Sequence, residues 1–86
     1  MENEIIKEVS YVKMSKHRKR TLLSLKENIK LPSEITKDEN MVFSDVSKSL
    51  TLLKERNLIK CLNETDNQGR LYKITTKGKE VIKYIE

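Results

Sequence analysis

The side chains that could do chemistry are concentrated between residues 44 and 56, in the stretch SDVSKSLTLLKER. Val46, Leu50 and Leu53 recur there at i, i+4 and i+7, which predicts an amphipathic helix. At about 100° per residue, the opposite face holds hydroxyl, carboxylate and ammonium groups together with one leucine. Its members are Ser44, Asp45, Lys48, Thr51, Leu52 and Glu55. Such a face can bind a polar partner through hydrogen bonds, or simply be solvated, as most polar helix faces are.

The residue types needed for catalysis or metal binding are scarce. His17 and Cys61 are each the only residue of their kind, whereas a metal site needs several converging ligands. No Ser/His/Asp arrangement, P-loop or glycine-rich phosphate loop is visible, and the chain has only two glycines. We therefore expect a protein that is not an enzyme and that has no metal ion or other cofactor.

The sequence also indicates a compartment. A single cysteine excludes an internal disulfide, which suits a reducing cytoplasm. The longest unbroken apolar run is Met41-Val42-Phe43, so no segment is expected to span a membrane. The first residues, MENEIIKE, are acidic where a secretory signal would be basic. We expect a cytoplasmic protein of one domain, residues 1–86, with no membrane partner.

Three helices are predicted before residue 44. The first covers about residues 3–13, and Ser15 can cap a second helix that runs to about residue 28. Pro32 suits the first turn of a short third helix that ends near residue 38. Asn40 can supply the turn after it, because asparagine tolerates left-handed backbone geometry. The apolar stripes are Ile5, Val9 and Val12 in the first helix and Leu22, Leu25 and Ile29 in the second.

A hairpin and a last helix are predicted after residue 56. Ser44 is the candidate N-cap of the 44–56 helix, and Asn57 can take the left-handed position that ends it. LIKCLN and RLYKIT read as strands joined by the turn-forming segment ETDNQG. Thr76 can cap a helix at about residues 77–86. The expected fold class is α+β: mainly helical, with a helix-turn-helix (32–38 and 44–56) and a two-stranded β-hairpin wing, tip about 64–70.

Double-stranded DNA is the partner that these features favour. The net charge is +5, and an α-helix fits the major groove, where its N-terminal residues reach base edges. Lys48 can donate to guanine or phosphate, Asp45 can accept from cytosine, and Thr51 and Leu52 can contact a thymine methyl. The small hydroxyl residues allow a close approach of the backbone. The residues expected to read the groove are Ser44, Asp45, Lys48, Ser49, Thr51 and Leu52.

Four more residues are expected to support this binding. Lys16, in the basic block SKHRKR, and Ser33, beside the free amides of a helix start, can hold the DNA backbone. Gln68 and Arg70 lie at the wing tip. Each has a plainer alternative: Lys16 is solvated, Ser33 only caps its helix, and the wing tip is a polar turn in which Arg70 pairs with Glu64 or Asp66.

The order of these motifs resembles a known family. VSKSLTLLKERNLIKCLN followed by GRLYKITTKGKEVIKYI is similar to winged helix-turn-helix regulators of the MarR and ArsR type, closest to small archaeal members. VSYVKMSKHRKRTLLSL and LPSEI resemble their first and second helices, so the match covers roughly residues 9–85. Asn57 replaces a usual glycine, and Arg56 and Leu52 also depart from the pattern. The resemblance implies a sequence-specific transcriptional regulator whose wing arginine, here Arg70, lies in or beside the minor groove.

Two other functions stay open. A winged helix can instead bind protein partners, through Leu52 and the apolar flanks, without reading DNA. Binding of RNA or single-stranded DNA is less favoured, because one Phe and three Tyr offer few surfaces on which bases can stack.

The terminal segments predict a homodimer. Apolar side chains of the first helix and of the last one, including Tyr84, form flanks that a small core leaves in need of cover. The alternative is that the two flanks cover each other within one chain.

Overall fold

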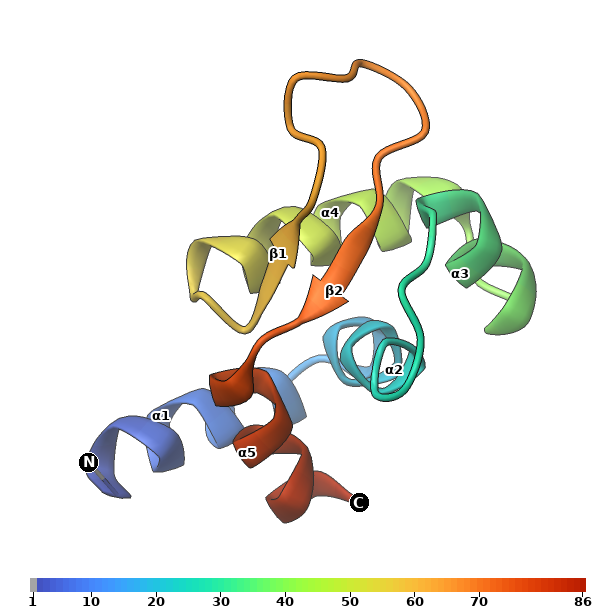
Figure 1. Cartoon of the computed structure of the whole chain (residues 1–86). Helices are drawn as coiled ribbons and strands as arrows, with labels where there is room; N and C mark the ends of the chain where they lie inside the picture. The colour runs from blue at the N-terminus through green and yellow to red at the C-terminus, as the bar shows by residue number, and fades with distance from the viewer. Residues whose placement is uncertain (1) are drawn as a thin grey trace.

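The computed structural model describes residues 2–86, with side chains from residue 4 onward. Five helices and one two-stranded sheet follow one another in the predicted order (Figure 1). The elements are α1 (Glu2–Lys13), α2 (Lys16–Ser24), α3 (Pro32–Asp38), α4 (Phe43–Glu55), β1 (Ile59–Cys61), β2 (Tyr72–Ile74) and α5 (Thr76–Ile85). The predicted α+β class is confirmed, with the helix-turn-helix pair α3–α4 followed directly by the hairpin.

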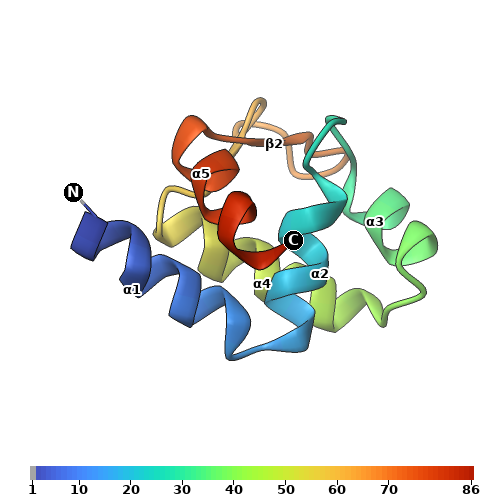
Figure 2. The ribbon, with the colours of Figure 1, turned by 90° about the horizontal axis from the view of Figure 1, so that it is seen from below.

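The five helices enclose one hydrophobic core. Figure 1 shows α1 and α5 below α2, and α4 above it with α3 beside one end of α4. Figure 2, seen from below, shows α4 running across the molecule behind α2. The terminal helices contribute Val12, Val81, Ile82 and Ile85, each at most 6% exposed. Their inner faces therefore cover the chain's own interior. The other members of the core are Leu22, Leu25, Ile35, Val46, Leu50, Leu53, Leu58, Ile59, Cys61, Tyr72 and Ile74.

The end of α2 differs from the prediction. The helix stops at Ser24 rather than near residue 28, and Ile29, expected on its apolar stripe, is 47% exposed. The cause is a long-range pairing. Lys30 exchanges two backbone hydrogen bonds with Tyr72, at 3.2 and 3.0 Å, which requires extended backbone there.

The caps agree with the prediction in part. Ser15 accepts a hydrogen bond from the amide of Arg18 at 3.2 Å, and Asn40 and Asn57 have φ angles of 53° and 62°. Those three predictions are confirmed. The predictions for Ser44 and Thr76 were wrong by a small shift. Helix α4 begins at Phe43 with Val42 as N-cap, and the cap of α5 is Thr75.

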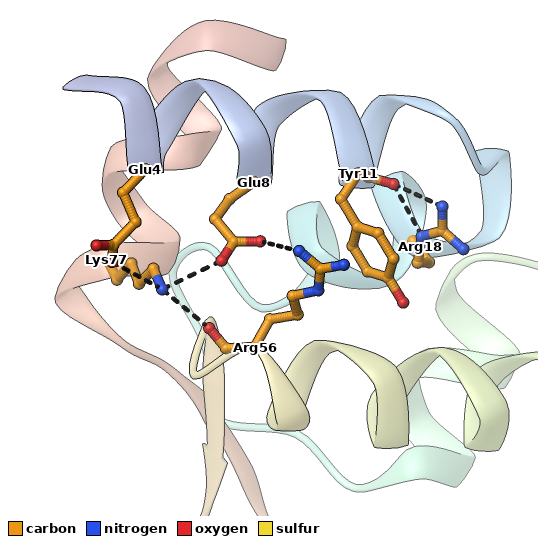
Figure 3. A network of polar contacts seen from close by, with 6 residues as sticks. All are labelled: Glu4, Glu8, Tyr11, Arg18, Arg56 and Lys77. Atoms are coloured by element: carbon orange, nitrogen blue, oxygen red, sulfur yellow. Dashed lines mark hydrogen bonds and ion pairs between the residues drawn. The ribbon is translucent and has the colours of Figure 1, made fainter. Parts of the chain in front are cut away.

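A buried carboxylate connects α1 to the rest of the fold (Figure 3). Glu8 is 6% exposed, and its two oxygens lie 3.1 Å from Arg56 Nη1 and 3.2 Å from Lys77 Nζ. The ring of Tyr11 lies between the guanidinium groups of Arg18 and Arg56, whose Cζ atoms are 4.0 and 3.8 Å from the ring centre. These contacts fix α1 to the end of α4 and the start of α5.

Gly78 allows α5 to pack closely on the start of the hairpin. A Cβ atom at this position would lie 2.2 Å from the carbonyl oxygen of Leu58 and 2.7 Å from Cγ1 of Ile74. The Leu58 oxygen also accepts a hydrogen bond from the amide of Thr75 at 3.0 Å, so it cannot move away freely. Glycine is therefore required by contact rather than by backbone angle.

We expect Gly78→Ala to lower the stability of the fold. Alanine normally stabilises a helix interior by about 1 kcal/mol relative to glycine, but here the clash should reverse the sign and cost about 1–3 kcal/mol. Thermal unfolding followed by circular dichroism measures the change in stability. Glu80→Ala is the control, because Glu80 is exposed on the same helix. A higher melting temperature for Gly78→Ala would contradict the close packing.

Candidate nucleic-acid interface

The outer face of α4 is polar and exposed. Ser44, Ser47, Lys48, Thr51 and Glu55 are all exposed, at a spacing that forms one stripe along the helix. The sequence analysis missed Ser47, although its position one turn before Thr51 is a usable signal. The two residues are also joined directly, because the Thr51 hydroxyl donates to the Ser47 carbonyl oxygen at 3.2 Å.

Ser49 does not belong to this stripe. It is 3% exposed, so its prediction as a base-reading residue was wrong. Ser49 lies three residues after Val46 and four before Leu53, which places it on the buried side of the helix. Ser49 is small enough to pack among the apolar side chains of the core.

Asp45 and Leu52 are only half-buried and lie at the edges of the stripe. The carboxylate of Asp45 is 3.6 Å from Nε2 of His17, on the first turn of α2. This contact places the exposed Lys16, which precedes His17, close to the first turn of α4. The other cations of the basic block are engaged in part: Arg18 donates to the carbonyl oxygen of Tyr11, and Arg20 to that of Glu39.

A cavity of about 460 Å³ separates α3 and α4 from the hairpin loop. Four predicted site residues line it: Ser33 on α3, Thr51 on α4, and Gln68 and Arg70 on the loop. Ser47 and Phe43, the latter 56% exposed, complete the α4 side. In Figure 1 the loop projects beyond α4 above this region. The fold thus brings α3, α4 and the wing tip to one surface.

The wing loop is held in shape by the side chain of Asn63. Its oxygen accepts from the amide of Leu71 at 2.8 Å, and its nitrogen donates to the carbonyl of Gly69 and the carboxylate of Asp66, both at 3.0 Å. One side chain therefore bridges both sides of the loop. Gly69 allows the turn, since its φ is 66°.

Arg70 is turned toward its own loop. Nε donates to the carbonyl oxygen of Asp66 at 2.8 Å, and Nη2 to that of Glu64 at 3.2 Å. Both acceptors are backbone atoms, so the side-chain pairing that the sequence left open is replaced by a backbone clamp. The carboxylate of Glu64 instead binds Nζ of Lys54 at 2.9 Å, and this hydrogen bond raises the pKa of Lys54. The ion pair connects the last turn of α4 to the wing.

Two classes of site are not seen in the part of the chain that the structure describes. Between residues 2 and 86, no three His, Cys, Asp or Glu residues gather as a metal site would require. No helix in the same range is long and apolar enough to cross a bilayer.

Comparison with known proteins identifies the family. The chain matches the winged helix-turn-helix family over residues 19–86 and belongs to it. The structure of Lactococcus lactis ZitR, a double mutant, is similar with a TM-score of 0.72 and 26% identity over 83% of this chain. This chain spans 49% of ZitR, about half of its length. No curated protein sequence matches the chain.

A second solved structure shares the fold. It is the homodimeric winged helix-turn-helix DNA-binding domain of Mycobacterium bovis Mb0332, a possible ArsR-family transcriptional regulator. The TM-score is 0.70 at 15% identity, and the match covers 94% of this chain and 77% of that one. At this identity the likeness concerns the fold alone. The suggested link to archaeal members stays a prediction.

Asn63→Ala should loosen the wing without unfolding the domain. Loss of a hydrogen bond worth about 0.5–1.5 kcal/mol should speed hydrogen exchange of the Leu71 amide about two- to tenfold. NMR-detected exchange measures this effect. Asn67→Ala is the matched control, because Asn67 is exposed in the same loop. Equal exchange rates in both variants would show that Asn63 does not hold the loop.

Proposed function

We propose that this protein is a sequence-specific double-stranded DNA-binding transcriptional regulator of the cytoplasm that acts by binding, not by catalysis. The observation that carries the proposal is the common surface formed by the polar stripe of α4, the start of α3 and the wing tip. A helix held beside an ordered loop can enter the major groove while the loop contacts the flanking backbone or minor groove. The DNA-binding Mb0332 domain supports this use of the fold.

The residue roles follow from exposure and reach. Lys48 and Thr51 lie at the centre of the α4 stripe and are proposed to contact base edges, with Ser44 and Ser47 allowing close approach. Asp45 and Leu52 border this contact. Arg70 has donors left beyond its loop bonds, because a guanidinium carries five N–H groups. Arg70 and Gln68 are therefore proposed to contact DNA from the wing.

The DNA backbone would be held by two exposed residues at helix starts. Lys16 begins α2 and lies close to the first turn of α4. Ser33 is the second residue of α3 and lines the cavity beside the wing. Ammonium and hydroxyl groups suit phosphate oxygens and fix the register of the protein on the duplex without reading sequence.

A protein-binding function is the rival. Val42 and Phe43, at the start of α4, are 63% and 56% exposed, and exposed apolar side chains of this size also suit a protein partner. Selection of bound sequences from a random duplex library separates the two. Enrichment of one motif supports DNA reading. No enrichment, together with no salt-dependent binding of duplex, would overturn the proposal in favour of a protein partner.

The homodimer is proposed to form through the outer faces of α1 and α5. These faces enclose a cavity of about 530 Å³ lined by Ile5, Ile6, Val9 and Tyr84 among others. Ile6 and Tyr84 are 60% and 64% exposed. A second copy would cover these apolar side chains by two-fold symmetry and would place two α4 helices on one DNA.

Lys48→Ala should cost about 1–3 kcal/mol of binding free energy on the selected site and relax the preference at one base pair. Lys16→Ala, which removes a backbone contact, should weaken all sequences alike. Titration of both variants against selected and random duplexes measures the difference. If Lys48→Ala weakens every sequence equally, Lys48 is only a phosphate contact.

Ile6→Glu should dissociate the dimer. Sedimentation equilibrium at micromolar concentration is expected to give twice the 10.1 kDa chain mass for the unmodified protein and the single mass for the variant. Ile29→Glu is the control, because Ile29 is 47% exposed and does not line the cavity between α1 and α5, so the dimer should stay intact. A concentration-independent single mass for the unmodified protein would rule the dimer out.

A further inference from the structure

The outer surface of the hairpin carries a lysine cluster that the proposed DNA-reading surface does not use. Lys60 and Lys73 are directly opposite each other in the sheet register, and both are exposed. Their strand neighbours Ile59, Cys61 and Tyr72 are buried. Because side chains alternate along a strand, the two lysines point away from the core to which α4 contributes. They therefore lie on a different side of the molecule from the α4 stripe.

A polar hollow adjoins this pair. It has a volume of about 460 Å³ and is lined by Lys60, Lys73, Lys77 and Lys79 together with Asn57 and Thr76. Its rim holds no carboxylate. Lys77 is neutralised by Glu4 and Glu8, at 3.4 and 3.2 Å. Within residues 4–86, Lys60, Lys73 and Lys79 have no carboxylate within 4 Å, so their charges are left uncompensated.

The placement of Lys60 opposite Lys73 disfavours the folded state. Like charges directly opposite each other on antiparallel strands repel. Some lysines elsewhere on the surface are paired with acids, as in Lys30 with Asp38 and Lys54 with Glu64, both at 2.9 Å, whereas Lys60 and Lys73 face each other. We call the hollow lined by Lys60, Lys73, Lys77 and Lys79 the lysine hollow. An anion from outside the chain would compensate its charge.

Phosphate is the anion that fits the lining. An ammonium group binds phosphate as a point charge, and hydroxyl and amide groups such as those of Thr76 and Asn57 donate to its remaining oxygens. An anionic membrane would need apolar anchors among the cations. The one apolar residue of the hollow, Ile74, is 4% exposed. The exposed Leu62 and Leu71 share the sheet face of Lys60 and Lys73 but do not line the hollow. The polar lining of the hollow therefore suits a nucleic-acid backbone, and a lipid surface is the outcome that the vesicle experiment below tests.

We propose that the lysine hollow binds the phosphate backbone of a second DNA duplex, so that one protein molecule joins two duplexes. The proposal rests on the proposed function only for the first duplex, the one bound by α4 and the wing. The second duplex is held by charge without sequence preference.

Capture of a second duplex tests the proposal. The selected duplex is immobilised and saturated with protein, and a short fluorescent random duplex is then added. We expect capture that falls as salt rises. Lys60→Gln/Lys73→Gln should lose this capture while it still saturates the immobilised duplex. Lys7→Gln/Lys83→Gln removes the same charge from exposed positions outside the hollow and should keep capture.

A direct titration keeps the test independent of the selected site. Each phosphate contact lowers log K by about 0.9 per unit of log salt, so Lys60→Gln/Lys73→Gln should flatten the slope on random duplex by about 1.8. Thermal unfolding is the second readout. Relief of the repulsion should leave the melting temperature of this variant equal or higher, which separates lost binding from lost folding.

Three results would overturn the proposal. Unchanged capture and an unchanged slope in Lys60→Gln/Lys73→Gln would leave the lysines without a role in DNA binding. A flattened slope with capture retained would assign them to the first duplex. Sedimentation of the unmodified protein with vesicles of phosphatidylserine, without capture of a second duplex, would assign the hollow to a membrane. If no first duplex can be selected, the proposed function fails. The salt slope on random duplex still tests whether Lys60 and Lys73 bind DNA.

Discussion

The position of the wing relative to α4 depends on one buried carboxylate, that of Glu8. Arg56 immediately follows α4, and Lys77 lies in the first turn of α5, so these two residues mark where the chain enters and leaves the hairpin. Glu8 binds both, and Nζ of Lys77 also donates to the carbonyl oxygen of Arg56 at 3.3 Å (Figure 3). A single side chain on α1 thus closes the base of the hairpin against both helices. Without it, the angle between α4 and the wing would depend on the short strands and on the exposed Lys54–Glu64 ion pair.

The buried carboxylate is stable only while both cations remain beside it. Removal of a carboxylate from water costs several kcal/mol, which paired charges and hydrogen bonds must offset. Burial alone lowers the pKa of Lys77, but hydrogen bonds to Glu8 and Glu4 outweigh it and raise that pKa above its usual 10.5. A cation whose pKa is raised by folding contributes its stabilisation fully below the unfolded value and loses it as pH rises through the folded one. Lys77 therefore keeps its charge, and with it its stabilising contacts to Glu8, across the neutral range.

The sequence predicted the elements where their signals are local. The Ser15 cap, the left-handed Asn57 and the apolar stripe of α4 each depend on residues within a few positions of one another, and all are found. The end of α2 was missed because a partner 42 positions away, Tyr72, requires extended backbone at Lys30. Spacing along one helix carries no information about such a pairing. The Glu8 network was missed for the same reason, since its members come from α1, the end of α4 and α5.

The candidate site was less predictable, because the folded chain decides which side chains are free to bind a partner. Lys48 and Arg70 look alike in sequence as exposed cations near turns or polar faces. In the structure, Arg70 donates to two carbonyl oxygens of its own loop and so shapes the wing, whereas Lys48 has no ion pair within residues 4–86. Groups that already have partners set the geometry of the surface. Groups left without partners, including the remaining N–H donors of Arg70, are the ones free to bind phosphate or a base. Lys60 and Lys73 belong to the second kind, and only the strand register, which places them opposite each other, makes this evident.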